Sequence, residues 1–102
     1  MSNRRIELNN VLESLLGTKN VYFQPPSTVK MHYPCIVYAR SAMDTKHANN
    51  EVYANRQCYS VTVVDPNPDS PILERLTALP FCRFDRHYTA DNLNHDVYSI
   101  YY

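Results

Sequence analysis

The fold is decided by residues 59–73, which read YSVTVVDPNPDSPIL. From Tyr59 onward, apolar and polar side chains alternate with the period of two that is typical of a β-strand. Asp65 opens a run of turn formers, so the strand is expected to end there. Ser70 and Pro71 then provide a helix N-cap and the proline that is favoured at the first helical position. The stretch predicts a strand, a loop and a helix in direct succession.

The flanking sequence supplies the remaining elements. Apolar positions spaced by three and four residues predict a helix from about Arg5 to Leu16, with Gly17 as its left-handed cap. The second helix is expected to stop at Pro80. Strands are expected at residues 21–23, 34–39, 59–64, 81–86 and 95–102, with the polar residues 91–94 joining the last two.

The predicted order is therefore helix, strand, strand, strand, helix, strand, strand, in one domain covering residues 1–102. This order predicts an α+β fold, in which a mainly antiparallel sheet of about four or five strands carries both helices on one face. The strands at 34–39 and 59–64 are expected to pair as a hairpin. The long polar connection between them, residues 41–56, is of a length that is often functional.

The composition excludes several classes of protein. Ten basic and ten acidic residues give no net charge, whereas nucleic-acid binders usually carry a basic surplus. The single glycine excludes a glycine-rich phosphate loop. Cys35, Cys58 and Cys82 form no CxxC pair, so we expect free thiols and no metal or other cofactor. Neither a signal peptide nor a membrane span is predicted, which indicates synthesis in a reducing cytoplasm.

Nine tyrosines favour contacts with other proteins, although tyrosine also suits the interior of a sheet. The C-terminal strand is expected to offer a sheet edge to a neighbouring subunit. Aromatic residues on both of its faces favour burial against a partner or a second layer. The predicted interface residues are Tyr98, Ile100, Tyr101 and Tyr102 on that strand, Asp85 and Arg86 before it, and His47, Asn49 and Tyr53 in the long connection. Asp85 and Arg86 suit either an ion pair at the interface or a solvated surface pair.

An alternative hypothesis is catalytic. His87, Asp91 and His95 are residue types that bind divalent metals, so they could form the site of a small hydrolase or nuclease. The competing interpretation is a polar crossing between two strands, since Asp and Asn favour turns. No HExxH or CxxC motif accompanies these residues. We therefore expect a protein that is not an enzyme.

The chain resembles the tail-terminator, or tail-completion, proteins of long-tailed bacteriophages. The resemblance is carried by the opening helix up to Gly17 and by VYFQPP (21–26), YPCIVY (33–38), YSVTVVD (59–65), DSP (69–71), FDRHY (84–88) and ADNLNHD (90–96). It implies a subunit of a homo-oligomeric ring, typically a hexamer, that caps the tail tube and meets the head connector. It also implies a place at the tail–neck junction of the virion, with DNA only passing through the lumen. A head-completion (stopper) protein of the same neck is the alternative.

Overall fold

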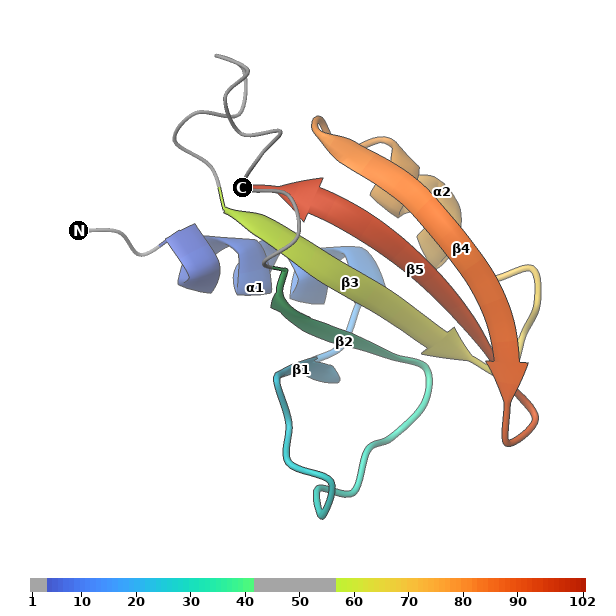
Figure 1. The fold of residues 1–102 in the computed structure, drawn as a ribbon. Helices are drawn as coiled ribbons and strands as arrows, with labels where there is room; N and C mark the ends of the chain where they lie inside the picture. The colour runs from blue at the N-terminus through green and yellow to red at the C-terminus, as the bar shows by residue number, and fades with distance from the viewer. Residues whose placement is uncertain (1–3, 42–56) are drawn as a thin grey trace.

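The computed structural model describes residues 4–41 and 57–102 (Figure 1). It contains, in order along the chain, α1 (Arg4–Leu16), β1 (Val21–Phe23), β2 (Cys35–Arg40), β3 (Cys58–Asp65), α2 (Ile72–Thr77), β4 (Cys82–Ala90) and β5 (Leu93–Tyr101). The predicted fold class and element order are confirmed. Each element lies within a few residues of its predicted position, and the largest differences are at β4 and β5.

The five strands form one mixed sheet in the order β1-β2-β3-β5-β4. The short β1 runs parallel to β2, and the other three pairings are antiparallel. The predicted hairpin of β2 and β3 is confirmed, with Cys35 opposite Val64 and Arg40 opposite Tyr59. The sheet therefore has two different edges, a short one at β1 and a long one at β4.

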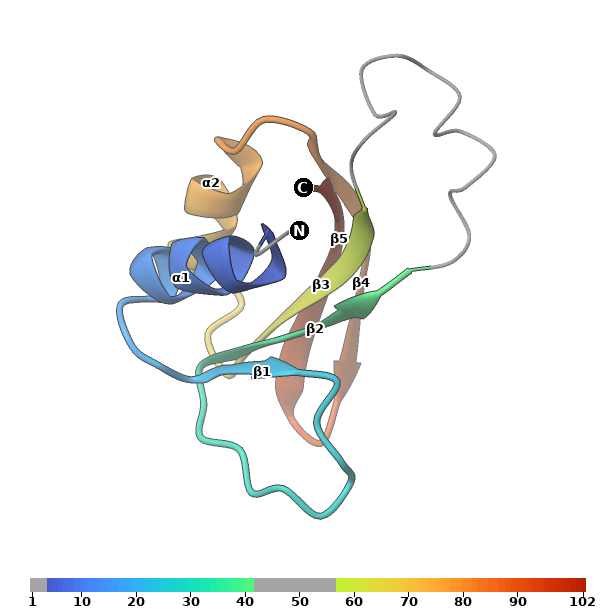
Figure 2. The same cartoon turned by 90° about the vertical axis from the view of Figure 1, so that its left-hand side faces the viewer.

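Both helices lie on one face of the sheet, as predicted (Figure 2). The core fills the space between them and the sheet, and its buried members are Leu8, Leu12, Leu16, Ile36, Tyr38, Tyr59, Val61, Val63, Ile72, Leu76, Tyr98 and Ile100. One hydrogen bond joins α1 to the sheet, and a second joins the two helices. The Tyr38 hydroxyl donates to Asn9 Oδ1 at 2.7 Å, and Arg75 donates to the carbonyl oxygen of Leu15 at 2.7 Å.

The expectation that the C-terminal strand lies at a sheet edge is wrong. β5 lies between β3 and β4, so β4 is the edge strand. The reason is burial: Asp96 to Tyr101 are all buried, whereas Arg83 to Ala90 are all exposed. A strand with apolar side chains on both faces gains more from a central position, where neighbouring strands cover its flanks.

The connection between β4 and β5 is shorter than the predicted stretch of four residues. Asp91 and Asn92 alone form the turn, both with positive φ (53° and 63°), and Ala90 pairs with Leu93. Positive φ at both central residues is typical of a type I′ hairpin turn, which Asp and Asn tolerate better than most residues. The polar residues before and after the turn continue the strands.

Gly17 ends α1 in the left-handed conformation predicted for it. Its φ is 87°, and its N–H donates to the carbonyl oxygen of Glu13 at 2.8 Å. No heavy atom lies within 4 Å of a Cβ built at this position. The requirement for glycine here is therefore conformational and not steric.

We expect Gly17→Ala to lower the free energy of unfolding by about 1 kcal/mol, because an L-residue in this conformation is strained. Urea denaturation measures the change. Ser14→Ala is a suitable control, since Ser14 lies exposed in the same helix. A Gly17→Ala variant as stable as the wild type would contradict the assignment of strain to this residue.

Candidate functional site: the β4 edge and the adjoining pocket

The edge strand β4 exposes aromatic and basic side chains together. Phe84 keeps 49% and Tyr88 42% of its surface accessible, which is unusual for large apolar side chains in a strand. The Arg86 guanidinium lies 5.8 Å from the centre of the Tyr88 ring, and that ring stacks on His95 with centroids 4.6 Å apart. Aromatic residues and arginine are enriched at protein interfaces. The strand thus combines an open backbone edge with side chains suited to a partner.

A register shift between Phe84 and Arg86 interrupts the pairing of β4 with β5. Asp85 lies at this irregularity and accepts a hydrogen bond from the Ser99 hydroxyl at 2.6 Å. Its ion pair within the chain is with Arg83, at 3.8 Å, and not with the adjacent Arg86. Bulges of this kind re-aim side chains and locally bend a strand. The Asp85 carboxylate therefore already has partners within the subunit, Ser99 and Arg83. Arg86 is exposed on the edge strand.

The structure does not bring His87, Asp91 and His95 together as a metal site. His87 pairs with Asp96 across the hairpin, with Nδ1 and Oδ1 2.9 Å apart. His95 is opposite Tyr88, the next position along the strand, so its ring lies on the other face of the sheet. No group of three or more metal-binding side chains occurs within residues 4–41 and 57–102. The alternative interpretation of this region, a polar strand crossing, is the one that the structure supports.

The remaining predicted interface residues are distributed differently. Tyr98 and Ile100 belong to the core, Tyr101 is buried, and Tyr102 is half-buried. His47, Asn49 and Tyr53 lie outside the described residues. Sequence reasoning missed the exposed Phe84 and Tyr88. The available signal was that the residues around them are polar on both faces, which is typical of an edge strand.

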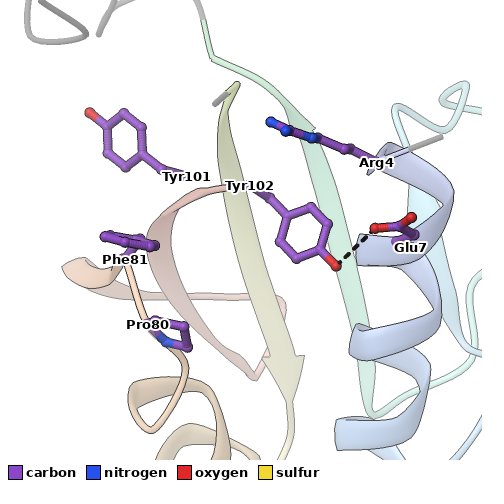
Figure 3. A pocket seen from close by; sticks show the side chains of 6 residues that line it. All are labelled: Arg4, Glu7, Pro80, Phe81, Tyr101 and Tyr102. Atoms are coloured by element: carbon purple, nitrogen blue, oxygen red, sulfur yellow. Dashed lines mark hydrogen bonds between the residues drawn. The ribbon is translucent and has the colours of Figure 1, made fainter. Parts of the chain in front are cut away.

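A pocket of about 300 Å³ adjoins the beginning of β4 (Figure 3). It is lined by Arg4 and Glu7 of α1, by Pro80 and Phe81 before β4, and by Tyr101 and Tyr102 at the end of the sheet. The Tyr102 hydroxyl donates to Glu7 Oε1 at 3.5 Å. Partial burial and the nearby Glu7 carboxylate raise the pKa of Tyr102, so the phenol keeps its proton.

Phe81 has a backbone conformation that is rare for a bulky residue, with φ 59°. Its carbonyl oxygen accepts a hydrogen bond from the N–H of Tyr101 at 3.1 Å, which fixes the corner between α2 and β4. Strained residues of this kind persist where the surrounding structure holds them and are common at functional sites. The corner places the Phe81 ring beside the pocket.

None of the three cysteines forms a disulfide. Burial raises the pKa of the Cys35 thiol to about 11, with a further contribution from the Asp65 carboxylate. Burial and Asp85 likewise raise the pKa of Cys82 to about 11. The thiolate is the nucleophilic form of cysteine, so these two thiols are unsuited to nucleophilic catalysis at neutral pH.

We expect the raised pKa values to make the fold sensitive to alkali. The unfolded chain releases thiol protons near pH 9, whereas folded Cys35 and Cys82 hold theirs to about 11. The contribution of the protonated thiols to the free energy of unfolding is fully present below pH 9 and is lost as the pH rises towards 11. Thermal denaturation at a series of pH values measures the decline. A Cys35→Ala, Cys82→Ala double variant should decline less steeply, and an equal slope would contradict the assignment.

No helix within the described residues is long and apolar enough to cross a membrane. Comparisons with protein families, with curated proteins and with solved structures gave no match.

Proposed function

We propose that this chain is a structural subunit of a tailed bacteriophage, a tail terminator that forms a ring, caps the tail tube and joins it to the head connector. The proposal rests on the resemblance of the sequence and on one observation above all, the long exposed edge strand β4. A strand that ends a sheet presents unpaired backbone groups to which another chain can add.

The two unlike edges of the sheet also support a ring. A ring forms through a heterologous contact, in which one surface of a subunit meets a different surface of the next. β1 and β4 lie at opposite edges of the same sheet, and they differ in length and in side chains. In such a ring, the β4 edge of one copy would contact the β1 edge of the next copy, and the same contact would repeat around the ring.

The absence of net charge is compatible with close packing of many identical copies, because such copies do not repel one another strongly. The side chains exposed on β4 fit the contact itself. Arg86 and Tyr88 are exposed on the outer strand, with the guanidinium 5.8 Å from the ring centre, and truncating such arginines and aromatics often causes the largest losses of binding.

The test is the mass of the purified protein by sedimentation velocity over a range of concentrations. We expect the wild type to approach a closed multiple of the 11.9 kDa subunit. An Arg86→Glu, Tyr88→Ser double variant should remain monomeric. A Lys19→Glu, Ile6→Ser variant carries the same kinds of change on exposed positions of the helical side and should assemble normally.

The second half of the experiment adds the protein to purified tail tubes and examines them by electron microscopy. A terminator should form a cap at one end of each tube and stop its elongation. A ring that bound the head connector and left the tube uncapped would favour a head-completion protein. A wild type that neither assembled nor bound either structure would refute the proposal.

A further inference from the structure

The pocket and the loop between β1 and β2 lie at opposite ends of the subunit. Figures 1 and 2 agree that residues 24–34 extend from one end of the sheet and that the C-terminal end of β5 lies at the other. The pocket lies at the same end as the C-terminal end of β5, where Tyr102 contacts Glu7 of α1. The loop joins the edge strand β1 to β2, whereas the pocket is lined by the residues before β4, by α1 and by the end of β5.

The loop exposes apolar and basic side chains, and hydrogen bonds fix part of its backbone. Tyr33 keeps 43% and Val29 38% of its surface exposed, and Lys30 is exposed between them. The N–H of Val29 donates to the carbonyl oxygen of Pro26 at 3.1 Å, and the N–H of His32 donates to the Tyr22 hydroxyl at 3.3 Å. Pre-formed loops of this kind lose less conformational entropy when they bind.

The pocket offers the complementary chemistry. Pro80 and Phe81 form an apolar wall, which suits an aromatic ring. Glu7 is exposed at the opposite side and accepts a hydrogen bond from Tyr102, so its carboxylate can face a basic side chain. Arg4 lies at the rim of the pocket.

We propose that the loop of residues 24–34 of one copy docks into this pocket of the next copy, with Tyr33 against the apolar wall and Lys30 facing Glu7. The inference rests on the proposed ring and specifies its contact. A second copy is the partner because the two complementary surfaces belong to the same chain and lie at its opposite ends. A repeated head-to-tail contact requires that arrangement.

Charge exchange tests the contact. Glu7→Lys and Lys30→Glu should each weaken self-association by about tenfold, because each places like charges face to face. The chain that carries both changes restores the pairing between copies and should assemble nearly as well as the wild type. Sedimentation velocity measures all three, and circular dichroism checks that each is folded. Lys19→Glu, an exposed charge reversal outside the loop of residues 24–34 and outside the pocket lining, is the control and should assemble normally.

A chain with both changes that assembles no better than the single variants would overturn the inference, as would a Lys30→Glu variant that assembles like the wild type. If both single variants assemble normally while the Arg86→Glu, Tyr88→Ser variant remains monomeric, the ring proposal stands and the loop contact falls.

A wild type that remains monomeric in solution is tested with a synthetic peptide of residues 24–34, titrated into the protein and followed by NMR. Shifts confined to the pocket residues, and absent in Glu7→Lys, are expected. A peptide that shifts no resonance of Glu7, Phe81 or Tyr101 would refute the loop contact, whatever the fate of the ring.

Discussion

Tyr98→Ala is expected to destabilise the protein by about 3–5 kcal/mol, the loss that is typical when a buried aromatic side chain is removed from a core. Tyr98 is 3% exposed and packs edge-on against Phe84, with ring centroids 5.4 Å apart. It is opposite Val61 on one side and Phe84 on the other, so its ring joins three strands. Urea denaturation at pH 7 measures the change.

The size of this loss matters because a domain of 102 residues has a total stability of only about 5–15 kcal/mol. Tyr88→Ala is the matched control, since Tyr88 lies on the neighbouring strand and is exposed. It should change the stability by less than about 0.5 kcal/mol, as is usual for surface positions. Equal losses from the two variants would contradict the division into a core tyrosine and an exposed one.

Leu12→Ala should cost about 3 kcal/mol, within the range measured for truncating fully buried leucines. Leu12 is completely buried at the centre of the apolar stripe of α1, between Leu8 and Leu16. The cavity would open beneath the helix, where it faces the sheet. The midpoint of thermal unfolding should therefore fall by well over 10 °C for a domain of this size.

Ile6→Ala is the control for this second variant. Ile6 lies in the same helix and has half of its surface exposed, so its removal should leave the stability nearly unchanged. A small effect at Leu12 would show that α1 is loosely attached, which the Tyr38–Asn9 hydrogen bond argues against.

The sequence was sufficient to predict the helices and strands, but not the order of the strands in the sheet. Alternation at Tyr59 and the cap at Gly17 are local signals, and both predicted the observed structure. The position of β5 is set by pairing between segments far apart along the chain. A period of two reveals which side chains share a face and not which strand lies beside them. The C-terminal strand was therefore assigned to the edge that β4 occupies.

The candidate site was less predictable for the same reason. The bulge at Asp85 depends on a mismatch in register between two strands, and no single residue type marks it. His87 and His95 are eight residues apart, which suggested proximity, but their pairing across the turn assigns them to opposite faces. The sequence also does not predict the positive φ of Phe81, because phenylalanine rarely adopts this conformation.

The central position of β5 has a consequence for synthesis. It is the last of the five strands along the chain, yet two of the four strand pairings need it. While residues 93–101 are still within the ribosome, β3 lacks a partner on one side and β4 has none. Sheet closure therefore waits for late translation, as expected of a fold dominated by distant contacts. A chain truncated before Leu93 would therefore lack the built β4 edge.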